Sequence, residues 1–399
     1  MGLEKFQIFF DLEPPVFYSG RIVTGRIEIV NRTPKKIRGI KVEIRGRSHV
    51  RWTTRRNNKD GKSETVVHQA FEEYFNTKFH VLGSKNSSEE LILEPGNYTY
   101  PFYCTLPANL PSSFEGDFGF IRYSLKAEVD RPWKFDYKAK ALFTVTCPLD
   151  LNGSPELVVS KFEKMTLIIN LQAPVRKEKF KTFGCCCCVS GPLNIIFTIP
   201  TGGVVPGETL MPTLDVENNS GVDLNQVSVK LIKLVTFKAG GRTKDTKVSI
   251  VEQNLGRLNS GQSSTYERVA LPVPSLPPSY LRNCNIIDLN YYVEASFSPS
   301  GCHRNFFIWM PLVIGTIPLQ QNFAQFSQAP PQPPPQQNFT PSAPQMDEPP
   351  PPYPSLAPPT FEESMFGAKN VFDDDKDEHT FGNKNFAPLY PVYKLGHLF

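Results

Sequence analysis

Residues 9–46, FFDLEPPVFYSGRIVTGRIEIVNRTPKKIRGIKVEIRG, decide the fold of this chain, because their apolar and polar side chains alternate with a period of two. Near the end of the stretch, charged residues separate Ile40, Val42 and Ile44. Successive side chains of a strand point to opposite faces, so this pattern predicts a half-buried strand with its charged face in solvent. Residues 30–36, VNRTPKK, are rich in turn-forming residues and predict the connection that precedes this strand.

The same design recurs in the second half of the chain. Residues 196–233, IFTIPTGGVVPGETLMPTLDVENNSGVDLNQVSVKLIK, align with residues 9–46 without a gap at a constant offset of 187, since 196 − 9 = 187. Apolar, glycine and asparagine positions coincide in the two copies, as in Phe10 with Phe197, Gly20 with Gly207, Asn31 with Asn218, and Val42 with Val229. The internal repeat predicts two copies of one structural unit.

Later segments of the two copies also correspond. Residues 93–114 and 258–280 both run through Leu-Pro, a spacer and further proline to an aromatic residue. In the strands that follow, the alignment of the two copies matches Tyr123 with Tyr291. Short strands with Pro and Gly turns, and no helical period, predict an all-β chain of two antiparallel β-sandwich domains. We expect domains over 1–150 and 191–318, with 151–190 as connector and start of the second domain, and a disordered Pro-rich tail over 319–399.

Composition restricts the class of protein. No apolar run approaches the roughly 18 residues of a membrane span, and no secretory signal begins the chain, so we expect a cytoplasmic protein with mostly reduced cysteines. After residue 318 the chain has nine acidic and four basic side chains, a net charge of −5. Because the whole chain has a net charge of +4, residues 1–318 carry about +9. Eleven basic residues lie between Lys35 and Lys62, which favours acidic surfaces, phosphorylated tails or anionic lipid as partners. No nucleic-acid-binding motif accompanies the charge, and no nucleic-acid partner is expected.

Catalytic motifs are absent from the sequence. It contains no GxSxG, Walker A, GxGxxG or HExxH pattern, and its six histidines are scattered. We therefore expect no enzyme activity, no catalytic residues, no cofactor and no metal site.

Three stretches of the chain carry a family resemblance: residues 110–133 (LPSSFEGDFGFIRYSLKAEVDRPW), 10–27 (FDLEPPVFYSGRIVTGRI) and 190–208 (SGPLNIIFTIPTGGVVPGE). Together they resemble the arrestin domain-containing proteins, or α-arrestins. The resemblance covers residues 5–318. It implies two tandem arrestin-type sandwiches and a tail that recruits WW-domain HECT-type ubiquitin ligases to membrane receptors, transporters and other cargo.

The tail contains short linear motifs. Pro350, Pro351 and Tyr353 form a PPxY ligand for WW domains, in which the prolines stack in an aromatic groove and the tyrosine fills a pocket beside it. The plainer alternative is a proline-rich spacer.

Pro388 and Tyr390 keep part of the PPxY pattern and predict a weaker WW ligand. Residues 341–344, namely Pro341, Ser342, Ala343 and Pro344, match the PSAP ligand of an ESCRT-I component, unless the match is accidental, and Tyr353 also begins an overlapping YPxL motif.

Two further segments leave alternatives open. The cysteine run follows a basic stretch and consists of Cys185, Cys186, Cys187 and Cys188. Reversible palmitoylation with peripheral membrane association, ordinary thiols at the start of a strand, and zinc binding all fit it, zinc least well because a second ligand pair is missing. The acidic segment 372–379 is either solvated or folds back on the basic N-terminal domain.

The predicted function is therefore a trafficking adaptor that is recruited to the plasma membrane and endosomes. It would link cargo to a HECT-type ligase, and through ESCRT to endosomal sorting. The alternative is an arrestin-like scaffold of endosomal sorting or vesicle budding that needs no ligase.

Overall fold

The computed structural model describes most of the chain, apart from short gaps and part of the tail. The described residues are 3–57, 63–84, 90–153, 156–162, 165–185, 188–189, 191–320, 359–370, 380–382 and 385–394.

The N-terminal domain is a sandwich of two mostly antiparallel sheets. The smaller sheet has the order β1-β3-β8, formed by Lys5–Phe10, Ile22–Asn31 and Gly96–Thr105. The larger sheet has the main order β2-β11-β10-β5-β6, formed by Val16–Tyr18, Tyr137–Thr146, Gly119–Asp130, Gly39–Asn57 and Ser63–Leu82. Short β9 (Phe114–Glu115) pairs with β10, and β4 (Lys35–Ile37) pairs with β7 (Leu91–Leu93).

The C-terminal domain repeats this arrangement. One sheet has the order β14-β17-β20-β23, formed by Val175–Lys181, Leu193–Ile199, Thr213–Asn218 and Ser263–Tyr266. The other has the order β18-β26-β25-β21-β22, formed by Gly203–Val204, Phe306–Ile314, Ile287–Pro299, Leu224–Ala239 and Arg242–Leu258. Shorter elements are β19 (Thr209–Leu210) with β24 (Leu271–Pro272), β15 (Gly184–Cys185) with β16 (Cys188–Val189), and the 3-10 turn η1 (Ser279–Leu281).

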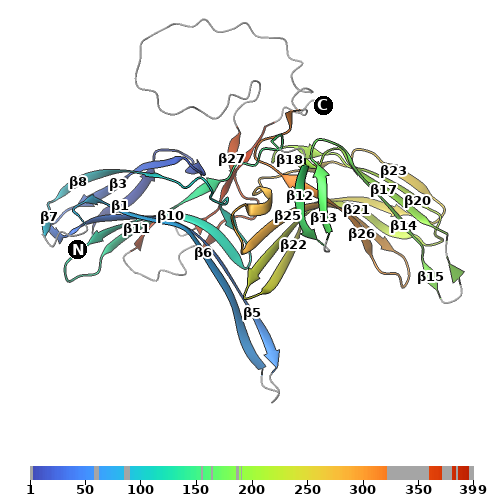
Figure 1. Ribbon diagram of the computed structural model, residues 1–399, viewed down its shortest axis with the longest axis horizontal. Coiled ribbons are helices and arrows are strands. Elements are labelled where there is room, and N and C mark those ends of the chain that lie inside the picture. Colours follow the sequence, from blue (N-terminus) through green and yellow to red (C-terminus); the bar gives the residue numbers. More distant parts are fainter. Residues whose placement is uncertain are drawn as a thin grey trace, which may run out of the picture.

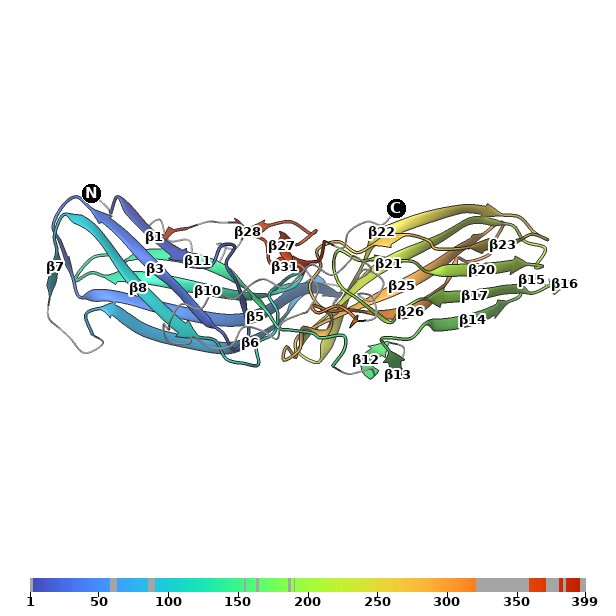
Figure 2. The same ribbon diagram turned by 90° about the horizontal axis from the view of Figure 1, so that it is seen from above.

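A hairpin connects the two domains. It consists of β12 (Glu156–Phe162) and β13 (Met165–Asn170). Figure 1 shows the two sandwiches beside each other along the long axis of the molecule, and Figure 2 shows the same order from above. The predicted fold class of two tandem β-sandwiches is confirmed.

The period of two that predicted the strands is present in β5. Ile40, Val42 and Ile44 are each 0% exposed, whereas Lys41 and Glu43 between them are only half-buried. The sandwich core thus forms from the apolar face, as the alternation requires.

The internal repeat extends to individual pairings. In the N-terminal domain, Val16 of β2 pairs in parallel with Thr144 of β11. In the C-terminal domain, Gly203 of β18 pairs in parallel with Val313 of β26. Positions 16 and 203 differ by the offset of 187 that aligns the two sequences.

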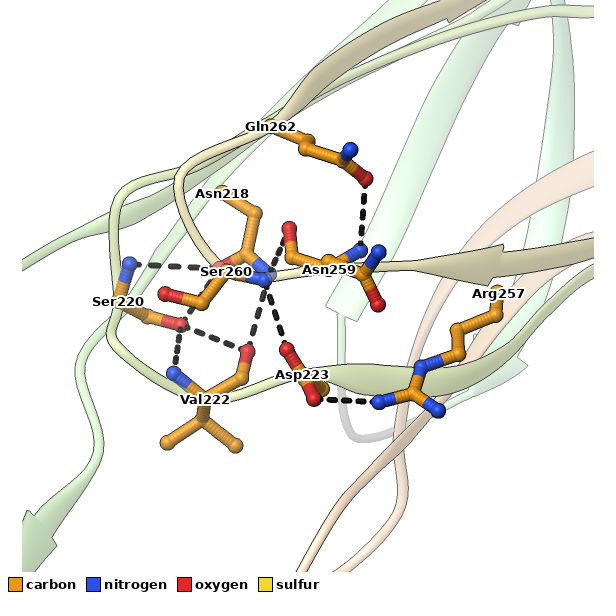
Figure 3. A network of polar contacts seen from close by, with 8 residues as sticks. All are labelled: Asn218, Ser220, Val222, Asp223, Arg257, Asn259, Ser260 and Gln262. Carbon is orange, nitrogen blue, oxygen red and sulfur yellow. Dashed lines mark hydrogen bonds and ion pairs between the residues drawn. The ribbon is translucent and has the colours of Figure 1, made fainter.

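The matched asparagines perform the same structural task in both domains. Asn31 Nδ2 donates to the Leu93 and Glu94 carbonyls at 2.8 and 3.1 Å. Asn218 Nδ2 donates to the Val222 and Asn259 carbonyls at 2.9 and 3.2 Å (Figure 3). Both side chains are buried, at 2% and 0% exposure, and both supply hydrogen-bond donors to backbone carbonyls at strand ends.

The matched tyrosines are also equivalent. Tyr123 donates its hydroxyl to the Pro111 carbonyl at 2.6 Å, and Tyr291 donates its hydroxyl to the Pro277 carbonyl at 2.8 Å. Both rings are buried, and each ties a central strand to the Pro-rich segment that precedes it in sequence.

The junction between the domains combines aromatic and polar contacts. Phe118 meets Phe237 edge-to-face with centroids 5.7 Å apart. Asn285 Nδ2 donates to the Glu72 carboxylate at 2.9 Å, which connects the C-terminal domain to β6. The long β5–β6 hairpin continues beyond the junction and projects from one side of the molecule (Figure 1).

Replacing Asn218 by alanine is expected to lower the free energy of unfolding by about 1–3 kcal/mol, because a fully buried amide and its hydrogen bonds to the Val222 and Asn259 carbonyls are lost. Urea or thermal unfolding measures the loss. Asn219→Ala is the matched control, since Asn219 is exposed and its Nδ2 reaches only the Glu217 carboxylate. Equal losses in the two variants would contradict the role of the buried amide.

Candidate functional site at the domain junction

The last described part of the chain returns to the domain junction. Its strands β27 (Thr360–Glu363) and β31 (Leu389–Val392) pair antiparallel and lie between the two sandwiches, on the side opposite the β5–β6 hairpin (Figures 1 and 2). Between them in sequence, β28 (Lys369–Asn370) pairs with β30 (Asn385–Phe386), and β29 (Thr380–Phe381) adds in parallel to β11. The described residues of 359–394 are called the C-terminal segment below.

This segment corrects part of the predicted tail. A disordered tail was expected over 319–399, but the described residues 359–370, 380–382 and 385–394 contain strands that lie against the body. The physical reason is their apolar content: Tyr390, Val392 and Tyr393 become buried at 1%, 8% and 8% exposure. Residues 321–358 lie outside the described residues.

Two tyrosines of the segment attach to different domains. Tyr390 donates its hydroxyl to the Ser113 carbonyl of the N-terminal domain at 2.9 Å. Tyr393 donates its hydroxyl to the Thr316 carbonyl at the end of the C-terminal domain at 2.7 Å. Burial, and next the charge of Glu115, raise the pKa of Tyr390 well above its ordinary value, so this hydroxyl stays protonated and remains a donor.

Backbone contacts reinforce both attachments. The Leu389 amide donates to Thr144 Oγ1 at 3.1 Å, and the Tyr393 amide donates to the Pro206 carbonyl at 2.9 Å. Gly207 has a φ of +95°, and a Cβ there would collide with the Tyr393 carbonyl. The glycine predicted to match Gly20 thus also permits the close approach of the C-terminal segment.

The first half of the segment contacts the C-terminal domain. Ser275 Oγ donates to the Glu362 carbonyl at 2.9 Å, and the Met365 amide donates to the Ser275 carbonyl at 3.2 Å. Phe366 lies over the ammonium group of Lys233, which is 3.0 Å from the ring centroid. Lys233 belongs to β21 and is only 5% exposed, so burial lowers its pKa to about 8.

An ion pair lies beneath the segment on the N-terminal side. Arg122 donates from Nε and Nη2 to the two oxygens of Glu115 at 2.6 and 2.9 Å. Glu115 is 7% exposed, and this burial raises the pKa of its carboxyl despite the hydrogen bonds from Arg122. Lys369 of the segment donates to the Gly116 carbonyl at 2.7 Å and lies 3.7 Å from the Asp117 carboxylate. The junction therefore holds charged groups that the segment helps to enclose.

The structure places few of the predicted site residues here. Pro388 and Tyr390 are buried in the segment, so in this conformation they are not exposed to a WW domain. Pro350, Pro351, Tyr353 and the PSAP residues 341–344 lie outside the described residues, as do Cys186 and Cys187. Cys185 and Cys188 are backbone partners in the pairing of β15 with β16, at the outer end of the C-terminal domain. Their side chains are not described.

The acidic segment 372–379 also lies outside the described residues. Its flanks are placed, because β28 precedes it at the junction and β29 follows it on β11. On the basic N-terminal face, several side chains already pair within the domain: Lys36 with Glu90 at 3.0 Å, and Arg45 with Glu73 at 2.6 Å.

Sequence reasoning missed Phe366, Tyr393 and Lys233 as members of a site. The only available signal was the aromatic content of FEESMF and PLYPVY, which is high for a solvated tail. No sequence pattern indicates where such a segment docks. Within the described ranges, no cluster of three or more metal-ligating side chains occurs, and no helix is long and apolar enough to cross a membrane.

Comparisons with known proteins agree with this two-domain architecture. Residues 6–152 match the family described as arrestin (or S-antigen), N-terminal domain, and residues 189–319 match its C-terminal domain. The chain is 28% identical to arrestin domain-containing protein 17 of Caenorhabditis elegans over 98% of this chain and 99% of that protein. It is 27% identical to arrestin domain-containing protein 4 of Mus musculus over 78% of this chain and 71% of that protein.

The chain therefore belongs to the arrestin-fold proteins. More narrowly, it is a member of the arrestin domain-containing proteins, the α-arrestins. This membership supports a general role as a trafficking adaptor and places the protein in a family of non-enzymatic scaffolds.

Replacing Tyr390 by alanine is expected to loosen the C-terminal segment, because a fully buried ring and its hydrogen bond to Ser113 are lost. Hydrogen exchange should become faster in β27 and β31. Tyr103→Ala, which removes a 77% exposed tyrosine from β8, is the control and should leave their exchange unchanged. Unaltered protection in Tyr390→Ala would show that this anchor is dispensable.

Lys233→Met should flatten the pH dependence of stability above pH 8. Because the folded protein releases this proton at a pKa of about 8 instead of the ordinary 10.5, the unfolded chain binds more protons between these values. The free energy of unfolding of the wild type therefore rises with pH across this window, by at most about 3 kcal/mol from this group. Urea titrations at several pH values measure the slope.

The control for this measurement is Lys238→Met on the same strand. The Lys238 ammonium pairs with Asp288 and its side chain is 41% exposed. If the free energy of unfolding of Lys233→Met rose with pH as steeply as that of the wild type, the burial assigned to the Lys233 ammonium group would be refuted.

Proposed function

We propose that this protein is a non-enzymatic trafficking adaptor that links membrane-protein cargo to a WW-domain HECT-type ubiquitin ligase. The observation that carries the proposal is the PPxY sequence of Pro350, Pro351 and Tyr353 in a chain with two arrestin domains. Two prolines and a tyrosine at this spacing supply the groove and pocket contacts of a WW ligand. The arrestin body would hold the cargo or the membrane.

The folded C-terminal segment supports a specific arrangement of this ligand. Leu319, before the motif, is 0% exposed, and Thr360, after it, starts β27, so both flanks of the PPxY sequence are attached to the body. Tyr353 and Thr360 are seven positions apart in the sequence, a stretch that spans at most about 25 Å. A WW domain bound to Tyr353 would therefore lie close to the domain junction while β27 is docked.

The weaker motif at Pro388 and Tyr390 would act in a second stage. Its tyrosine is 1% exposed in the docked segment, so a WW domain could reach it only after the segment leaves the junction. Ligases with several WW domains would gain avidity from the second motif once it is released. Ligase binding at Tyr353 and release of β31 would then favour each other.

Further sorting steps are proposed from the sequence. Pro341, Ser342, Ala343 and Pro344 would bind an ESCRT-I component, and lipidation of the run 185–188 would add peripheral membrane association. The protein would accordingly act at the plasma membrane and on endosomes.

Tyr353→Ala is expected to abolish capture of an isolated fragment with several WW domains, because the tyrosine pocket is left empty. Tyr390→Ala in the same full-length chain is the comparison and should retain capture, since Tyr390 is buried in the docked state. A pull-down with purified proteins measures both. Capture that survives Tyr353→Ala would remove the motif assignment, and the lack of any WW binding by the wild type would favour a ligase-independent scaffold.

A further inference from the structure

The turn between β10 and β11, residues 131–136, presents two aromatic side chains to solvent. Trp133 is 100% exposed and Phe135 is 81% exposed, the two highest values among the large hydrophobic side chains of the described residues. Leaving this much apolar surface in water costs free energy, and aromatic side chains grouped in this way commonly mark a contact surface.

The turn is held in shape by its own contacts. The Arg131 amide donates to Asp136 Oδ1 at 2.8 Å, and Arg131 Nε donates to the Phe135 carbonyl at 2.7 Å. The Arg131 guanidinium also lies over the Tyr137 ring, 3.7 Å from its centroid. Trp133 has a φ of +59°, a backbone region that side chains of this size rarely adopt. The chain therefore maintains a strained turn that keeps Trp133 directed away from the body.

Strands β4 and β7 extend this surface. The Arg38 amide, directly after β4, donates to the Asp130 carbonyl at 2.9 Å, which places β4 beside the turn. Opposite Lys36 of β4, Ile92 of β7 is 59% exposed. Figures 1 and 2 both show β7 at the outer end of the N-terminal domain, away from the junction. The exposed apolar side chains thus gather at the tip of the molecule.

Basic side chains outnumber acidic ones at the apolar tip. Lys36 pairs with Glu90, Arg38 pairs with Asp130, and Asp136 accepts from the Arg131 amide, while Lys35, Arg131 and Lys134 add further positive charge. Lys134 lies between the two aromatic residues in sequence, and burial together with the charges of Arg131 and Lys134 lowers the pKa of Lys35. Arg131 and Lys134 both repel the Lys35 ammonium group, and a layer of negative charge would relieve this repulsion.

The geometry points to this tip, formed by Trp133, Phe135 and Ile92 with Lys35, Arg131 and Lys134 around them, as a contact surface for anionic lipid bilayers. Tryptophan and phenylalanine insert at the level of the headgroups, while lysine and arginine remain among the lipid phosphates. A projecting tip with apolar centre and cationic rim fits a bilayer surface, whereas a peptide ligand would need a groove. The inference is independent of the ligase assignment.

Binding to phosphatidylserine-containing vesicles tests the proposal, with pure phosphatidylcholine vesicles as the neutral comparison. The full-length protein should co-sediment with the anionic vesicles, and its tryptophan emission should shift to the blue. Trp133 can report insertion because it is fully exposed, whereas Trp52 is 5% exposed and Trp309 belongs to β26 of the other domain. Trp133→Phe should keep most of the binding and lose the shift.

The decisive variant is Trp133→Ser with Phe135→Ser, which should weaken partitioning to anionic vesicles by at least about tenfold, because two inserted aromatic side chains are lost. Tyr103→Ser is the matched control, an exposed aromatic residue on β8 of the same domain. Thermal unfolding verifies that the variants are folded. The proposal would be overturned if the double variant partitioned as strongly as the wild type, or if the vesicles caused no blue shift in the wild type. It would also be overturned if an acidic polypeptide, and not the vesicles, protected Trp133 from solvent.

Discussion

The two sandwiches are joined by the C-terminal segment, because β31 and Tyr393, the residue that directly follows it, are attached to both domains. Tyr390 bonds to Ser113 of the N-terminal domain and Tyr393 bonds to Thr316 of the C-terminal domain. Since a strand advances about 3.3 Å per residue, the three steps between these tyrosines span about 10 Å. Both hydrogen bonds form only when the two carbonyls lie at a matching separation. The strand therefore acts as a spacer between the domains, in addition to the direct contacts of Phe118 with Phe237 and of Glu72 with Asn285.

The buried charges at the junction oppose this attachment. Removal of Glu115 and Lys233 from water is unfavourable, as the raised pKa of the carboxyl and the lowered pKa of the ammonium group show. The ion pair with Arg122 and the ring of Phe366 offset only part of this cost. Release of the C-terminal segment would hydrate these groups again, so part of the free energy lost from Tyr390 and Tyr393 would be recovered.

The two proposed contact sites lie at different places on the body. The proposed lipid contact lies at the outer end of the N-terminal domain, whereas the flanks of the PPxY sequence lie at or near the junction. The long β5–β6 hairpin projects on the side of the junction opposite β27. An adaptor of the proposed kind would need membrane, cargo and ligase to bind different faces, and the distance between the outer end and the junction would meet this need. The family resemblance alone does not define this arrangement.

Local pattern by itself determined the tandem sandwiches. The apolar and charged side chains of residues 40–44 alternate because successive side chains of a strand point to opposite faces. Asn31 and Asn218 match because the same buried turn occurs in both domains. The linear motifs could be read for a similar reason, since a WW ligand is recognised in an extended chain. The docking of Tyr390, the enclosure of Lys233 beneath Phe366 and the exposure of Trp133 were decided only by the tertiary structure. Each depends on which surfaces, distant in sequence, meet or fail to meet, and side-chain type alone does not encode that choice.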